Sequence, residues 1–338
     1  MIKTKTALAL ASALVLFGGA AQADTLKTIR DRGKLICGTS QGVAGFSKQN
    51  AEGKWEGFDT DICRALAAAV FDDPDKVAYV PLSSKDRLIA LQSGEVDVLP
   101  RTTTWTLSRN ASQGVTFTAV NYYDGQGFLV RKSLNVKSAT ELGGASVCVA
   151  QGTTSELNLA DYFKSKGLKY ELAAFGTPDE GIKAYENGRC DVYTTDMSSL
   201  VADKLKFAKP DDHMLLPEVI SKEPLGPWVR QGDDRWFNLV RWTVMALVNA
   251  EELGITKANV EAMRKSDNPE IKRFLGNDGA FGEALGVSND WVVRIVKTVG
   301  NYSESFDRNL GEASRLKLPR SVNNLWTKGG LQYSAPFR

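Results

Sequence analysis

One order of strands and helices occurs twice along this chain, and it restricts the possible folds more than any other feature of the sequence. Each half has three strand-like stretches with two helix-like stretches between them. In the first half these are residues 35–38, 59–71, 78–80, 84–93 and 96–99. In the second half they are residues 146–150, 157–166, 170–172, 178–187 and 190–193. The βαβαβ order predicts a parallel sheet with helices on its faces in each half.

The two halves also share one residue spacing, which in each copy is typical of a helix end, a glycine that stops the helix, and the next strand. The two copies are Ala90-xxx-Gly94-xx-Asp97-Val98 and Ala184-xxx-Gly188-xx-Asp191-Val192. A match this short also arises by chance in α/β proteins. Its place in the repeated order nevertheless favours a duplicated architecture of two α/β lobes.

Two extended segments connect the halves. Residues 122–130 contain glycines at 125 and 127, which allow a backbone bend. Residues 219–229 contain Pro224, Gly226 and Pro227. Two extended crossings between two α/β lobes predict a two-strand hinge.

The crossings also predict the limits of the lobes. Lobe 1 is expected to be discontinuous, with residues 24–126 and 226–338, and lobe 2 to comprise residues 127–225. The C-terminal extension of lobe 1 is expected to wrap that lobe, with Trp326, Tyr333 and Phe337 as aromatic anchors.

The N-terminus has the order of a cleavable secretory signal. Lys3 and Lys5 precede an apolar run at residues 7–17, and Ala21-Gln22-Ala23 follows. The alternative is a transmembrane anchor, which needs roughly 20 apolar residues, more than this run supplies. We therefore expect residues 1–23 to be a signal peptide, cleavage between Ala23 and Asp24, and a periplasmic protein. No cysteine stands at the cleavage point, so a lipid anchor is not expected.

The charge balance argues against several classes of function. The chain has 42 basic and 40 acidic residues, and loss of the two signal-peptide lysines leaves 40 of each. Nucleic-acid binders usually carry a basic surface, so no nucleic-acid partner is expected. The single histidine, His213, lies in an acidic segment and is expected to be a solvated loop residue. No catalytic triad, metal site or cofactor is expected.

Polar side chains follow three of the expected strands. They lie in residues 101–109, in residues 151–155 and in residues 194–196. Ligands of open parallel sheets bind beyond the carboxyl ends of the strands. Arg109 suits a carboxylate, and Asp196 suits an ammonium group, so the set favours a zwitterionic ligand. The alternative is that the threonines and Asp196 are helix caps and that Arg109 is a surface cation.

Several segments together resemble the solute-binding proteins of polar amino-acid ABC importers (family 3), and in particular the general L-amino-acid-binding proteins of Gram-negative bacteria. The resemblance covers essentially the whole mature chain. The segments are Gly57-Phe58-Asp59-Thr60-Asp61-Ile62-Cys63-Arg64-Ala65, residues 91–98, residues 103–109, residues 122–128, Gln151-Gly152-Thr153-Thr154, residues 188–196 and residues 325–333. The resemblance implies a periplasmic-binding-protein-like α/β fold that closes around its ligand.

The resemblance also implies roles for individual residues. Arg109 would hold the ligand carboxylate, assisted by Thr104, Thr153 and Thr154, and oxygens near Thr102 would accept from the α-ammonium. Asp196 would be the counter-ion of the ammonium. Many relatives hold the ligand side chain between aromatic residues, but Val43 and Lys85 occupy those positions here. The full expected ligand-binding set is Arg109, Thr104, Thr102, Thr153, Thr154, Asp196, Lys85, Arg101 and Ser40.

These roles predict capture of several L-amino acids, with acidic and polar ones favoured by Lys85 and Arg101. The expected partners are a free L-amino acid and an inner-membrane ABC permease, and the protein is expected to be a monomer. Two alternatives stay open: an amino-acid sensor, and a dehydratase-like periplasmic enzyme. The enzyme would need a placed acid or base. Asp196 already has a binding role, and Glu156 suits a helix start.

Four cysteines allow three disulfide pairings. An oxidising compartment favours bonds over free thiols. A bond between the lobes would resist closure, so we expect Cys37–Cys63 within lobe 1 and Cys148–Cys190 within lobe 2.

Overall fold

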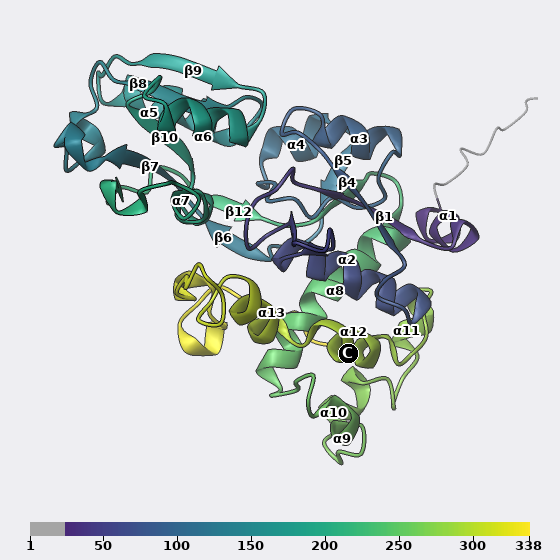
Figure 1. Cartoon of the computed structure of the whole chain (residues 1–338). Helices are drawn as coiled ribbons and strands as arrows, with labels where there is room; N and C mark the ends of the chain where they lie inside the picture. Colours follow the sequence, from purple (N-terminus) through teal and green to yellow (C-terminus); the bar gives the residue numbers. More distant parts are fainter. Residues whose placement is uncertain (1–23) are drawn as a thin grey trace, which may run out of the picture.

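The computed structural model describes residues 24–338, and the expected signal peptide lies outside the described residues. Two α/β lobes are connected by an extended two-strand hinge, which confirms the fold class expected from the sequence (Figure 1). Lobe 1 denotes here the body around β1, and lobe 2 the body around β8. None of the helices in the described residues is long and apolar enough to cross a membrane.

The first lobe is built on a sheet with the order β4, β1, residues 98–99, β13 and β5. Its elements before the hinge are α1 (Thr25–Arg32), β1 (Leu35–Thr39), β2 (Lys48–Gln49), β3 (Trp55–Glu56), α2 (Phe58–Phe71), β4 (Val77–Pro81), α3 (Arg87–Ser93), α4 (Leu107–Ser112) and β5 (Val115–Phe117). The strand expected at residues 96–99 is reduced to single bridges, Val98 to Cys37 and Leu99 to Trp228.

The second lobe contains a five-stranded sheet with the order β11, β7, β10, β8 and β9. Its elements are β7 (Gln126–Arg131), η1 (Lys132–Leu134), η2 (Ala139–Glu141), β8 (Ser146–Ala150), α5 (Thr154–Ser165), β9 (Glu171–Phe175), α6 (Pro178–Glu186), β10 (Val192–Asp196), α7 (Met197–Lys204), η3 (Pro210–Asp212) and β11 (His213–Leu215). β8 is parallel to both β9 and β10, as the βαβαβ order predicts.

The shared spacing has the same structural role in both lobes. Gly94 and Gly188 both adopt positive φ, 86° and 77°, at the ends of α3 and α6. The Asp97 carboxylate accepts a hydrogen bond from Ile36 N at 2.7 Å, and the Asp191 carboxylate accepts one from Ser146 N at 2.9 Å. In each lobe the aspartate therefore fastens the start of one strand to the start of its parallel neighbour.

The hinge consists of β6 (Tyr122–Asp124) paired antiparallel with β12 (Glu223–Leu225). Neither Gly125 nor Gly127, the glycines that the sequence suggested allow a bend, has a positive φ. Both glycines instead allow a close approach. A Cβ atom at these positions would lie 2.2 Å from Val219 Cγ1 and 2.1 Å from Met197 Sδ, respectively.

After the hinge, the chain returns to the first lobe and adds a mainly helical extension. The elements are β13 (Trp228–Arg230), α8 (Asp234–Glu252), α9 (Val260–Met263), α10 (Pro269–Phe274), α11 (Phe281–Ala284), α12 (Trp291–Val299), α13 (Tyr302–Asn309), η4 (Ser321–Asn323) and η5 (Trp326–Lys328). α12 and α13 pack against α2 and α8, and α9 to α12 lie on the side of lobe 1 away from lobe 2 (Figure 1).

One of the three aromatic residues expected to anchor this extension does so. Phe337 packs against Trp242 and Phe274, with ring centroids 4.9 and 4.8 Å apart. Trp326 and Tyr333 are 50% and 58% exposed and contact each other, so their expected role as anchors is wrong.

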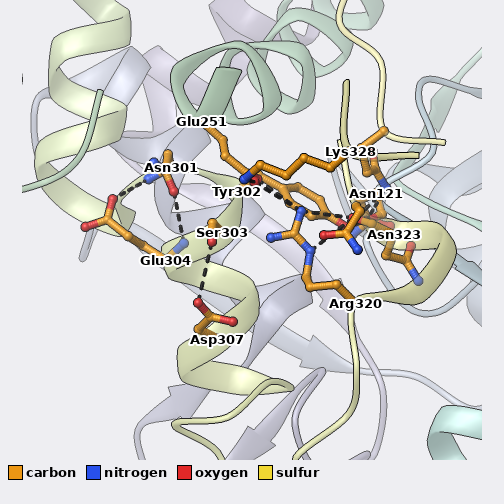
Figure 2. Close-up of polar contacts among 12 residues, drawn as sticks. Asn121, Glu251, Asn301, Tyr302, Ser303, Glu304, Asp307, Arg320, Asn323 and Lys328 are labelled. Carbon is orange, nitrogen blue, oxygen red and sulfur yellow. Dashed lines mark hydrogen bonds and ion pairs between the residues drawn. The ribbon is translucent and has the colours of Figure 1, made fainter. Parts of the chain in front are cut away.

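The extension also holds one strand of the hinge. The Asn323 side chain donates to Tyr123 O at 2.9 Å and accepts from Tyr123 N at 2.7 Å, as a neighbouring strand would. Tyr302 Oη donates to Asn121 O at 2.8 Å. Arg320 pairs with Glu251 and stacks over the ring of Tyr302 (Figure 2).

Both expected disulfide bonds are present, and each lies within one lobe. Cys37–Cys63 joins β1 to α2, and Cys148–Cys190 joins β8 to the segment between α6 and β10.

The histidine, His213, is not solvated, contrary to expectation. It is 8% exposed, and its Nδ1 lies 2.8 Å from Tyr185 Oη, because β11 turns its side chain toward the core of lobe 2.

Candidate functional site

A cleft between the two lobes brings together most of the expected ligand-binding residues. It contains about 560 Å³ of empty space, part of it open to solvent. Lobe 1 lines it with Val43, Ser84, Arg87, Arg101, Thr102 and Thr104; lobe 2 lines it with Ala150, Thr153, Thr154, Ser155, Pro178, Tyr193, Thr195, Asp196, Ser199 and Asp203. Most of the lining residues are of polar or charged types, and both lobes contribute charge.

Buried contacts hold the threonine-rich segment in place. Thr102 has a φ of 38°, and its N–H donates to Asp59 Oδ2 at 3.0 Å. Trp228 Nε1 donates to Thr103 O at 3.0 Å. Burial raises the pKa of Asp59 to about 6, although hydrogen bonds from Asn121 and Thr102 favour its anion. This anchoring presents Thr102 and Thr104 to the cleft.

Arg109 lies behind this segment rather than in the lining of the cleft. It is buried in α4, and its Nη1 donates to Thr104 O at 3.0 Å. Burial lowers the pKa of Arg109, and the charges of Glu223 and Asp196 partly oppose that shift. The guanidinium is therefore poorly solvated and experiences two nearby carboxylates.

Two further arginines reach the cleft. Arg101 Nε donates to Leu82 O at 2.9 Å, and burial lowers the pKa of Arg101 to about 10. Arg87, the first residue of α3, is 4% exposed, and its Nε has no hydrogen-bond partner within the described residues. Burial lowers the pKa of Arg87, and the charges of Arg109 and Arg101 lower it further.

Arg87 was missed in the sequence because it looked like one polar residue among several at a helix start. Its position at the start of the helix that follows the carboxyl end of β4 is the signal that could have identified it.

Besides Arg109, two expected residues do not line the cleft, Lys85 and Ser40. The Lys85 side chain is exposed, while its backbone approaches Gly152 so closely that a Cβ atom there would lie 3.1 Å from Lys85 Cα. Ser40 is buried in its own loop, where its Oγ lies 2.6 Å from Ser47 Oγ and accepts from Val43 N. Ser40 therefore shapes the first loop from within.

The second lobe contributes a helix start and an aspartate. Thr153 caps α5 by accepting from Glu156 N at 3.2 Å, so the helix-cap interpretation holds for Thr153 even though it lines the cleft. Asp196 precedes α7, but its side chain makes no capping hydrogen bond. Burial raises the pKa of Asp196 well above its usual value, and the charges of Asp124 and Glu223 add to this effect.

A hinge carboxylate was also missed in the sequence. Glu223 of β12 is 2% exposed and accepts four hydrogen bonds. The donors are Thr104 at 2.5 Å, Thr154 at 2.8 Å, Asn158 at 2.8 Å and Ser221 at 2.7 Å. No sequence signal distinguished it from an ordinary surface glutamate beside a proline.

The cleft thus has buried arginines on one wall and carboxylates on the other. Such an arrangement suits a small zwitterion, whose two charges would otherwise be costly to remove from water. Across residues 24–338, no group of three or more His, Cys, Asp or Glu side chains is placed to hold a metal ion.

Known proteins share this architecture. The profile of the bacterial extracellular solute-binding proteins, family 3, matches residues 35–257, so residues 258–338 lie beyond the matched segment. The general L-amino acid-binding periplasmic protein AapJ of Rhizobium johnstonii is 55% identical over 97% of both chains. The glutamate/glutamine/aspartate/asparagine-binding protein BztA of Rhodobacter capsulatus is 50% identical over 96% of both chains.

Solved structures agree with these sequence matches. A periplasmic binding protein from Brucella ovis with glutathione bound is 55% identical, with a TM-score of 0.91 over 94% of this chain and 100% of that chain. An ancestral arginine-binding protein bound to arginine has a TM-score of 0.57 at 28% identity and covers 66% of this chain. The chain therefore belongs to family 3 of the bacterial extracellular solute-binding proteins.

Proposed function

We propose that this protein is the periplasmic receptor of an amino-acid ABC importer and binds free L-α-amino acids in the cleft between its lobes. The observation that carries the proposal is the polarised cleft, with buried arginines on lobe 1 facing Asp196 on lobe 2. An α-amino acid has one carboxylate and one ammonium group on the same carbon, so a cleft of this polarity can pair both at once.

In this proposal, Arg109 holds the α-carboxylate and Asp196 holds the α-ammonium, with Thr102 beside it. Arg109 is buried beneath Thr104, so a carboxylate would replace part of the solvation that its guanidinium has lost. Arg87 takes the place of Lys85 beside Arg101 as a residue that favours acidic side chains, because Arg87 lines the cleft and Lys85 does not.

The cleft also suits several side chains. Val43 occupies the position of one expected aromatic residue and leaves room there. One methylene in such a pocket is worth only about 1–3 kcal/mol of discrimination. The relative from Brucella ovis holds glutathione, whose γ-glutamyl end also carries a free α-ammonium and α-carboxylate. Compounds with a γ-glutamyl group are therefore proposed as additional ligands.

Delivery to an inner-membrane permease is the proposed fate of the ligand. The curated relatives named for transport or for periplasmic binding support this assignment, including a putative amino-acid ABC transporter-binding protein of Escherichia coli at 52% identity. Transport assays with the permease, reconstituted in vesicles, distinguish delivery from a purely sensory role. The enzyme alternative is not proposed, because the acids at the cleft already have binding roles or hydrogen-bond partners.

A calorimetric panel tests the proposed ligand class. Glutamate, glutamine, alanine, leucine, arginine and glutathione are titrated into the protein after unfolding and refolding to remove any bound ligand. We expect binding of several members and weak binding of D-glutamate. Tight binding of one member, with the rest at least a thousandfold weaker, would refute broad specificity but not the amino-acid cleft.

A further inference from the structure

The buried hinge carboxylate of Glu223 has no place in the expected ligand-binding set, yet it contacts two members of that set. Thr104 belongs to lobe 1 and Thr154 to lobe 2, and both hydroxyl groups lie within hydrogen-bond distance of the same oxygen, Oε2. Asn158 and Ser221 donate to the other oxygen, Oε1. Four donors match the acceptor capacity of one ionised carboxylate.

This geometry determines what the two threonines can offer a ligand. A hydroxyl group has one hydrogen and two acceptor lone pairs. If both hydrogens point to Glu223, the 3.3 Å contact between Thr104 Oγ1 and Thr154 Oγ1 contains no hydrogen, and both oxygens can only accept. Hydroxyl groups that can only accept attract an ammonium group and repel a carboxylate.

We infer that Glu223 is a positioning residue that turns the hydroxyl groups of Thr104 and Thr154 into acceptors for the α-ammonium of the ligand. The inference rests on the proposed amino-acid function and changes the role of these threonines, which the family resemblance assigned to the carboxylate. Both threonines line the cleft. The negative charge of Glu223 also acts on Asp196, the proposed counter-ion of the ammonium.

The arrangement depends on the relative position of the lobes. Glu223 lies on the hinge, and its donors come from lobe 1 through Thr104 and from lobe 2 through Thr154 and Asn158. The pair of acceptors is therefore complete only when the two lobes approach each other at the hinge side of the cleft. Ligand selection for an ammonium and closure of the lobes are coupled through one carboxylate.

The variant Glu223→Gln tests the inference, because glutamine keeps the shape but must donate at one end. A threonine hydroxyl that faces the amide nitrogen must accept from it and turn its hydrogen toward the cleft, and in either orientation of the amide the negative charge is lost. We expect L-glutamate to bind about 10- to 100-fold more weakly, the loss typical of a charge-assisted hydrogen bond. 2-Hydroxyglutarate lacks the ammonium group, so its affinity, measured by competition, should not fall. The ratio of the two affinities should fall at least about tenfold.

A double-mutant cycle provides the second readout. Thr104→Val and Thr154→Val together remove both hydroxyl groups. Adding Glu223→Gln to this double variant should therefore lower the affinity for L-glutamate little further than the larger of the two separate losses, that of the double threonine variant or that of Glu223→Gln alone. The matched control is Glu218→Gln, a carboxylate that accepts from Ser138 within lobe 2 and does not line the cleft. It should leave the affinity ratio unchanged, and circular dichroism establishes that each variant is folded.

The outcomes separate this inference from the proposed function. If the wild-type protein binds none of the amino acids in the panel, the proposed function fails. If the wild-type protein binds L-glutamate, two results overturn the inference alone. In the first, Glu223→Gln lowers the affinities for L-glutamate and 2-hydroxyglutarate equally. In the second, Glu223→Gln has its full effect in the double threonine variant. Should Glu223→Gln not fold, Thr154→Val alone must still lower the affinity ratio for the inference to survive.

Discussion

The two walls of the cleft bury opposite charges. Lobe 1 lines its wall with Arg87 and Arg101 and buries Arg109 behind Thr104, whereas lobe 2 lines its wall with Asp196 and the hinge buries Glu223 beside it. Within the described residues, none of these arginines forms an ion pair with a carboxylate. The lobes therefore do not neutralise each other, and a ligand with both charges would find an oppositely charged partner on each wall.

The pKa shifts describe the same separation. Burial is the largest cause of the lowered pKa of Arg87 and of the raised pKa of Asp196. In each wall, burial thus destabilises the charged form of the group while the cleft is empty. A carboxylate beside the arginines and an ammonium beside Asp196 would reverse both tendencies, which makes the two walls separately testable.

Removal of Arg109 should have the largest effect. Arg109→Ala leaves the carboxylate of every amino acid unpaired in a buried place, at a cost on the order of 3–5 kcal/mol. Calorimetry should therefore detect no binding of any member of the panel, while the circular dichroism spectrum is unchanged. Arg264→Ala, at an exposed position directly after α9, is the control. Near-native affinity in Arg109→Ala would show that another arginine holds the α-carboxylate.

The opposite wall should make binding depend on pH. The raised pKa of Asp196 means that the empty cleft favours the protonated acid, whereas a bound ammonium favours the anion. Binding therefore releases protons, and the affinity should fall as the pH is lowered, by up to about tenfold per pH unit. Asp196→Asn should bind amino acids more weakly and show a flatter profile. A pH dependence identical in the variant and the wild type would exclude Asp196 as its source.

A smaller and selective effect is expected from Arg87. Arg87→Met keeps the packing of the side chain but removes a charge that lines the cleft. We expect a loss of about tenfold for glutamate and aspartate, equal to about 1.4 kcal/mol, and little change for alanine or leucine. Calorimetry with these four ligands measures the difference. An equal loss for all four would place Arg87 at the α-carboxylate instead.

The smallest effect should come from outside the cleft. Asn323→Ala removes both hydrogen bonds between the C-terminal extension and β6, at a cost of about 1–2 kcal/mol in the free energy of unfolding. A thermal melt should show a decrease of a few degrees, with charge recognition preserved. Asn324→Ala, whose side chain bonds only locally to Ser321, is the control. A change in the ratio of the affinities for L-glutamate and 2-hydroxyglutarate in Asn323→Ala would instead show that the extension influences ligand selectivity.

Local pattern was sufficient for much of the architecture. Glycines at 94 and 188 and the apolar strand runs predicted both βαβαβ halves, because helix stops and buried strands depend on nearest neighbours. The threonine-rich segment and Asp196 were placed at strand ends, and the carboxyl ends of parallel strands meet at one edge of a sheet. The structure brings Thr102, Thr104 and Asp196 to one cleft for that reason.

Other features depended on contacts between segments distant in the sequence. Glu223 acquires its four donors only because the hinge brings residues from both lobes to β12, and Asn323 finds Tyr123 two hundred positions away. Arg87 enters the cleft while Lys85, two residues earlier, faces solvent. A sequence pattern reports the face of a helix or strand, but the burial and partners of one polar side chain depend on which other surface packs against it.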